Sequence, residues 1–171
     1  MKRTKSTYLA VLAILLLPMA ANGDLIGFTV NQTFYFPDDT SLFCDNGNVL
    51  VGGGVEYPSG CPGFGGVVTD IFDTYLTVDT GGVDFGAASF NGFLLSILDD
   101  LDFLSASYGG GTMSVSSLSI LDGGLWANFQ GQSGGIARID FTTTSVPEPA
   151  TFALFGIGLA GILLARRRRK V

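Results

Sequence analysis

Glycine clusters divide the middle of this chain into short segments. Of its 25 glycines, 21 lie between residues 24 and 145, many of them in adjacent pairs or triplets. Between these clusters apolar and polar residues alternate, so that Ala137, Ile139 and Phe141 would share one face of a strand. Alternation with period two, interrupted by turn signals roughly every ten residues, is typical of antiparallel strands. The sequence therefore predicts an all-β fold over residues 24–141, an antiparallel β-sandwich or a jelly-roll-like domain.

Three other stretches bear on this fold. Residues 70–79 predict one alternating strand, and residues 125–130 predict another. Residues 94–104 fit strand spacing and helix spacing; a strand followed by a turn is favoured, and a short helix remains the alternative. Residues 24–145 as a whole contain 12 phenylalanines and one tryptophan. This is enough aromatic side chain to build a core, and it is atypical of disordered chains. On the first of these strands we expect Phe72, Thr74, Leu76 and Val78 opposite Ile71, Asp73, Tyr75, Thr77 and Asp79, and on the second Leu125, Ala127 and Phe129 opposite Trp126, Asn128 and Gln130.

Charge excludes several functions for residues 24–145. The segment holds 14 acidic residues and one base, Arg138, which gives 1 − 14 = −13, and the chain has no histidine. Nucleic acid is therefore not an expected partner, because phosphate recognition needs clustered basic residues. No nucleophile motif occurs and nothing in the sequence marks Glu56 as buried, so we do not expect an enzyme; a polysaccharide hydrolase is the distant alternative.

Acidic clusters supply the oxygen ligands that calcium prefers. Asp99, Asp100 and Asp102 form the candidate site, although no known calcium-loop pattern is present. The alternative is that these acids only keep an extracellular protein soluble. No other cofactor is expected.

The two cysteines, Cys44 and Cys61, predict a disulfide. A lone pair in an exported chain normally joins in an oxidising compartment. A metal or redox pair is the alternative, which the lack of a CxxC spacing disfavours.

The beginning of the chain predicts an export signal over residues 1–23. Three basic residues precede an apolar run, and small residues suited to signal peptidase follow at Ala20–Gly23. An uncleaved membrane anchor is the alternative.

Residues 150–165 predict a short transmembrane helix. They carry no charge and are followed by a basic tail at 166–171. Because positive residues stay in the cytoplasm, the β domain would lie outside the inner membrane, in the periplasm. The membrane stop is formed by Arg166, Arg167, Arg168, Arg169 and Lys170.

A proline-rich tetrapeptide precedes this span, within a linker expected at residues 142–149. Val146, Pro147, Glu148 and Pro149 cannot continue a helix or a strand interior, so they predict an extended, accessible segment at the membrane surface. Such a segment suits a processing enzyme, whereas a plain linker is the alternative.

The sequence VPEPATFALFGIGLAGILLARRRRK resembles the PEP-CTERM sorting signal of Gram-negative bacteria. The resemblance implies recognition by exosortase, a membrane-embedded transpeptidase-like enzyme, with removal of the tail near Pro147–Pro149 and delivery to the cell surface or beyond. It also implies an association with extracellular polysaccharide or biofilm. The middle of the chain is similar to a β domain that recurs in such proteins, which implies a fold but no activity.

These observations predict an exported surface protein with a structural or adhesive role. A carbohydrate- or calcium-binding β module is the alternative. Exposed aromatic residues such as Tyr75 and Trp126 could stack on sugar rings, although aromatic side chains more often pack in a core or across strands.

Overall fold

The computed structural model describes residues 25–61 and 66–144. The predicted signal peptide, the Val146–Pro149 motif, the span at 150–165 and the basic tail lie outside these residues. Within them no helix is long and apolar enough to cross a membrane. The described residues form nine strands: β1 (Thr29–Tyr35), β2 (Leu42–Leu50), β3 (Val68–Ile71), β4 (Tyr75–Asp79), β5 (Gly92–Ile97), β6 (Phe103–Gly111), β7 (Ser117–Leu121), β8 (Gly124–Asn128) and β9 (Ile136–Thr143).

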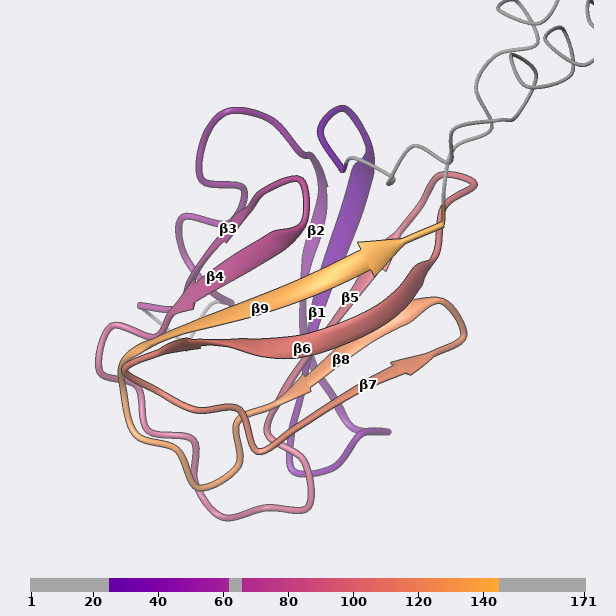
Figure 1. The fold of residues 1–171 in the computed structure, drawn as a ribbon. Coiled ribbons are helices and arrows are strands. Elements are labelled where there is room, and N and C mark those ends of the chain that lie inside the picture. Colours follow the sequence, from indigo (N-terminus) through magenta and orange to yellow (C-terminus); the bar gives the residue numbers. More distant parts are fainter. Residues whose placement is uncertain (1–24, 62–65, 145–171) are drawn as a thin grey trace, which may run out of the picture. The chain divides into compact units, whose positions relative to one another are not determined.

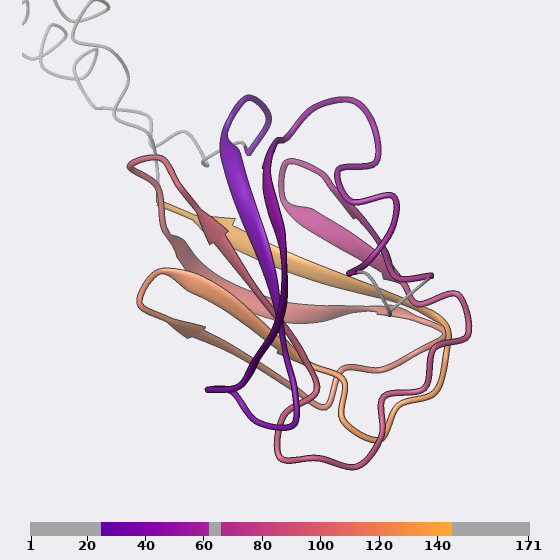
Figure 2. The same cartoon turned by 180° about the vertical axis from the view of Figure 1, so that it is seen from behind.

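The strands form two sheets. Sheet A has the order β2-β1-β5-β8-β7 and sheet B the order β3-β4-β9-β6. Every pairing within them is antiparallel. β1 and β2 of sheet A cross β9 and β6 of sheet B at a steep angle, whereas β7 and β8 run closer to the direction of β9 and β6 (Figures 1 and 2). Within sheet B, β9 lies between β4 and β6. The prediction of an all-β, antiparallel, two-sheet fold is confirmed.

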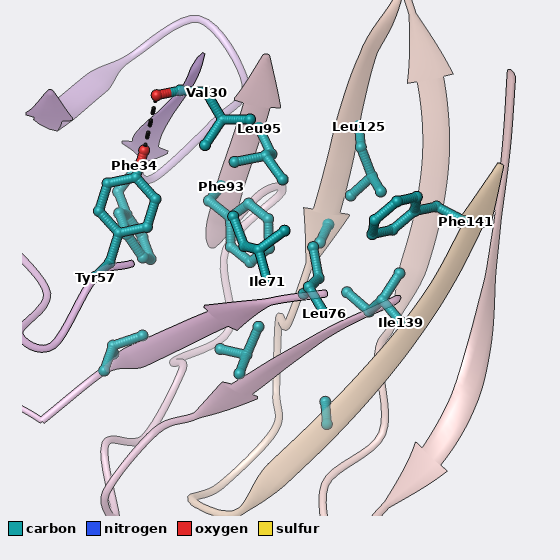
Figure 3. Close-up of a cluster of buried hydrophobic side chains, with 14 of the residues drawn as sticks. Val30, Phe34, Tyr57, Ile71, Leu76, Phe93, Leu95, Leu125, Ile139 and Phe141 are labelled. Carbon is teal, nitrogen blue, oxygen red and sulfur yellow. Dashed lines mark hydrogen bonds between the residues drawn. The ribbon is translucent and has the colours of Figure 1, made fainter. Parts of the chain in front are cut away.

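The core lies between the sheets and follows the predicted alternation on β9. β8 ends at Asn128, two residues before the end of the strand expected at 125–130, and Asn128, expected opposite Leu125, is also buried. On β9, Ala137, Ile139 and Phe141 are buried, and on β8 Leu125 and Ala127 are fully buried. Side chains from sheet A meet those from sheet B in one apolar layer, which Figure 3 shows. Burial of these side chains provides the main driving force for bringing the two sheets together.

Four phenylalanines make a continuous chain of ring contacts inside this layer. The ring centroids of Phe34 and Phe93 are 5.8 Å apart, those of Phe93 and Phe129 are 5.8 Å apart, and those of Phe129 and Phe85 are 5.2 Å apart. Phe34 and Phe93 lie opposite each other on β1 and β5, whereas Phe85 and Phe129 come from loops. We call these four residues the aromatic core.

The prediction for residues 70–79 was wrong in one respect. The run is not one strand: β3 ends at Ile71, β4 begins at Tyr75, and the two pair as a hairpin. Ile71 and Leu76, which were expected on opposite faces, are partners in this hairpin and both are buried. The alternation therefore continued through a turn.

The ambiguous stretch at residues 94–104 is resolved as strand and turn. β5 continues to Ile97, a turn follows, and β6 begins at Phe103, so the short helix is not formed. β9 continues through Thr143 and thus includes the first two residues of the segment 142–149.

Candidate functional site

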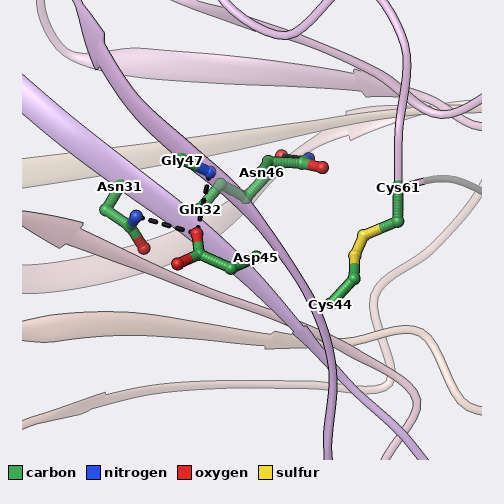
Figure 4. The surroundings of a disulfide bond; sticks show 7 residues. All are labelled: Asn31, Gln32, Cys44, Asp45, Asn46, Gly47 and Cys61. Atoms are coloured by element: carbon green, nitrogen blue, oxygen red, sulfur yellow. Dashed lines mark hydrogen bonds between the residues drawn. A yellow bond between two sulfur atoms is a disulfide. The ribbon is translucent and has the colours of Figure 1, made fainter.

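The disulfide predicted between Cys44 and Cys61 is confirmed. Cys44 lies on β2 and Cys61 in the segment that leads towards β3, with their Cα atoms 6.0 Å apart. Cys61 is buried, and Figure 4 shows the bond near Asp45, Asn46 and Gly47 of β2. The bond ties an edge strand of sheet A to the connection between the two sheets.

Glu56, in the same connection, is buried, which nothing in the sequence indicated. Its side chain is 8% exposed. One carboxylate oxygen accepts a hydrogen bond from the Gly52 N–H at 3.0 Å and the other accepts one from the Ile71 N–H at 2.7 Å. Both oxygens are thus engaged in holding backbone, and the residue is a structural acceptor.

Tyr57 and Thr69 continue this arrangement. Each donates a backbone hydrogen bond of 3.0 Å to the other. The Tyr57 hydroxyl points at the carbonyl oxygens of Val30 and Gly47, and Gln32 donates from Nε2 to the Thr69 hydroxyl at 2.9 Å. Buried polar groups of this kind stabilise only when they are paired, as they are here. We call Gln32, Glu56, Tyr57 and Thr69 the polar edge.

The candidate calcium ligands lie in the β5–β6 connection. Asp99 Oδ2 accepts a hydrogen bond from the Thr29 N–H at 2.7 Å, and the Asp102 backbone exchanges two hydrogen bonds with Thr144. The connection thereby joins the start of β1 to the end of β9. Among the described residues no group of three or more acidic, cysteine or histidine side chains is arranged to hold a metal. Calcium binding stays a prediction.

Trp126 lies on the outer face of sheet A, beside two other aromatic rings. It pairs with Leu94 of β5 and Ser119 of β7. Its ring lies 5.1 Å from that of Tyr35 and 5.6 Å from that of Phe90. All three rings are half-buried, and part of each therefore faces solvent.

Tyr75, the other aromatic residue expected to meet sugars, lies on the outer face of sheet B. Its ring stacks on Phe72 at 4.4 Å, and the Arg138 guanidinium lies over it at 3.8 Å. Two partners this close cannot share one face of the ring, so both faces are covered. Arg138 also donates to Asp140 at 2.7 Å. Tyr75 is therefore not an open stacking surface.

The comparison with protein families bears on the residues after the sandwich. Residues 145–169, which are 25 of the 171, match the family model of the PEP-CTERM protein-sorting motif. The chain carries a PEP-CTERM sorting signal. This confirms the resemblance read from Val146–Pro149, the apolar run and the arginine cluster. No curated protein and no solved structure matches the chain.

The PEP-CTERM signal implies an exported protein that is processed by exosortase and is transiently anchored in the membrane. The sorting signal could be detected from the sequence because its parts follow one another directly along the chain. The surroundings of Trp126 could not be detected in this way, because Tyr35, Phe90 and Trp126 come together only through strand pairing.

Proposed function

We propose that the mature protein is a structural or adhesive component of the cell surface or extracellular matrix, delivered there through its PEP-CTERM signal and associated with extracellular polysaccharide. The observation that carries the proposal is where the motif begins. β9 ends at Thr143 and the motif match starts at residue 145. Cleavage near Pro147–Pro149 would therefore leave all nine described strands in the released product.

The proposed role is non-enzymatic. The one glutamate between residues 24 and 145 holds two backbone N–H groups, which supports a structural use of that carboxylate. The net charge of the segment supports solubility outside the cell.

Intact mass of the protein extracted from the cell surface tests the sorting step. We expect the wild-type mass to end between Thr144 and Pro149. In the triple variant Pro147→Ala, Glu148→Ala, Pro149→Ala, exosortase would lack its motif, and the mass should retain Arg166–Lys170. Ser145→Ala is the matched control and should be processed normally. A wild-type surface protein that still carries the basic tail would overturn the proposal.

Aggregation of cells tests the adhesive role separately. A strain lacking the protein should aggregate less, and the wild-type chain should restore aggregation. The triple alanine variant, made in equal amount, should not. Equal aggregation of all strains would contradict the adhesive role and would not affect the proposed sorting step.

A further inference from the structure

The outer face of sheet A carries a row of side chains that crosses all five strands. Strand pairing places Asp45 beside Thr33, Thr33 beside Leu94, Leu94 beside Trp126, and Trp126 beside Ser119. Partners in antiparallel strands point to the same face of the sheet. At ~4.8 Å per strand the row spans about 19 Å, which is the length of several pyranose rings.

The aromatic part of this row is broadened by Tyr35 and Phe90. Tyr35 pairs with Gly92 of β5, and its ring centroid lies 5.1 Å from that of Trp126 on the next strand, β8. We call Tyr35, Phe90, Leu94 and Trp126, together with Thr33, Asp45, Asn31 and Asn48 beside them, the Trp126 face.

The polar part of the Trp126 face keeps hydrogen-bonding atoms open. Asn31 Nδ2 donates to Asp45 Oδ1 and to Asn48 Oδ1, each at 2.9 Å, and the Gly47 N–H also donates to Asp45 Oδ1. This fixes the three side chains, part of which Figure 4 shows. Three polar groups of this face have no hydrogen-bond partner among the described residues: Asp45 Oδ2, Asn48 Nδ2 and the Thr33 hydroxyl.

The charges of this face restrict the ligand. Its ionic group is the Asp45 carboxylate, and Arg138, the one base between residues 24 and 145, is on sheet B. A polyanion would be repelled, because like charges without a counterion raise the free energy of association. An uncharged sugar needs what the face offers: partly exposed aromatic rings for its C–H bonds, and a carboxylate, an amide and a hydroxyl for its hydroxyl groups.

We propose that the Trp126 face binds an uncharged polysaccharide with equatorially substituted pyranose units, of the β-1,4-glucan type. The apolar face of one ring lies on Trp126 and Tyr35, and the hydroxyl groups of a neighbouring ring bond to Thr33, Asp45 and Asn48. This deepens the proposed function by giving the adhesive role a site and a ligand class.

The fluorescence of Trp126 tests the proposal directly, because the chain has one tryptophan. The full-length chain in detergent is titrated with cellohexaose. We expect the emission to shift to shorter wavelength as the indole loses water. Raising the salt concentration should leave the affinity unchanged, and a galacturonate hexamer should cause no shift. No shift with cellohexaose, or an equal shift with the galacturonate hexamer, would overturn the proposal.

Substitutions locate the binding at this face. Thr33→Val keeps the shape of a β-branched side chain and removes one hydroxyl, so the affinity should fall by about fivefold. Trp126→Ala should lower the affinity for cellohexaose by at least about tenfold, measured by calorimetry because this variant has no tryptophan fluorescence. Tyr75→Ala, on sheet B, is the matched control and should bind like the wild type. Unchanged affinity in Thr33→Val and Trp126→Ala would contradict the assigned face.

Sugar binding and sorting can fail separately. The titration uses the chain before processing, so a negative result would remove the sugar site and leave the PEP-CTERM route intact. A chain that binds cellohexaose but keeps its tail at the cell surface would support the sugar site and contradict the sorting step.

Discussion

The aromatic core and the polar edge stabilise the same sandwich in different ways. The aromatic core consists of four phenylalanine rings in contact between the sheets. The polar edge consists of buried hydrogen bonds around Glu56 and Tyr57, with the Cys44–Cys61 bond nearby. The first gains free energy from removing apolar surface from water, whereas the second mainly avoids leaving buried polar groups unpaired. Apolar burial is therefore expected to dominate the stability, and the polar edge to fix one particular arrangement of the connection.

Truncation of the aromatic core should have the largest effect. Phe93 is fully buried and contacts two other rings, so Phe93→Ala removes apolar area and leaves a cavity. We expect the free energy of unfolding to fall by about 3–5 kcal/mol, measured by urea denaturation. Phe93→Leu should cost less because it fills most of the space. A loss below about 1 kcal/mol in Phe93→Ala would mean that the aromatic core does not dominate.

Reduction of the disulfide should come next. Closing a loop between residues 17 positions apart lowers the entropy of the unfolded chain, so reduction should cost about 3 kcal/mol. Urea denaturation with and without a thiol reductant measures this. In the double variant Cys44→Ala, Cys61→Ala, the reductant should have no effect. An equal shift in that variant would show that the reductant acts elsewhere.

Neutralising Glu56 should weaken the polar edge. In Glu56→Gln one side-chain atom becomes a donor, so either the Gly52 or the Ile71 N–H loses its acceptor. We expect a loss of about 1–3 kcal/mol in urea denaturation. Asp70→Asn on neighbouring β3 is the matched control, because it removes the same charge without breaking a hydrogen bond in the described residues. Equal effects of the two variants would attribute the loss to charge alone.

Removing the Tyr57 hydroxyl should have the smallest effect at neutral pH, about 1 kcal/mol in Tyr57→Phe. Burial raises the pKa of the Tyr57 phenol well above its usual value of 10.0. Below pH 10 the Tyr57 phenol is neutral in both the folded and the unfolded chain, so its full contribution to the free energy of unfolding is present. Above pH 10 it ionises only in the unfolded chain, so the wild type loses up to about 1.4 kcal/mol per pH unit from this residue.

Urea denaturation at neutral and alkaline pH measures this difference. Tyr57→Phe should lose less stability than the wild type between about pH 10 and pH 11, so the two curves should converge. Parallel curves would show that the hydroxyl of Tyr57 ionises as easily in the folded protein as in the unfolded chain.

The two regions also differ in how far the sequence reveals them. Alternation around Leu125 and Ile139 identified buried faces, because period two is a local property of strands. The break between β3 and β4 was missed because Phe72-Asp73-Thr74 contains neither glycine nor proline, and the alternating pattern passes through it. Apolar burial was thus visible wherever the chain stayed extended.

Hydrogen bonds between distant segments were not visible. The Glu56 carboxylate accepts a hydrogen bond from the Ile71 N–H, 15 positions away. The donor is a backbone group, so no particular side chain in the sequence reveals this partner. The row from Asp45 to Ser119 likewise depends on the register of five strands, which alternation does not determine. The PEP-CTERM signal could be read because all its parts are contiguous.

The place of β9 has a mechanical consequence. β9 is an interior strand, paired with β4 on one side and with β6 on the other, and its last residue is Thr143. Tension applied through the chain after Thr144 is directed along β9, so it shears the backbone hydrogen bonds to β4 and those to β6 at the same time. An edge strand has hydrogen bonds on one side only, which can break one after another. A domain pulled from this end is therefore expected to unfold at a higher force than one pulled from an edge strand.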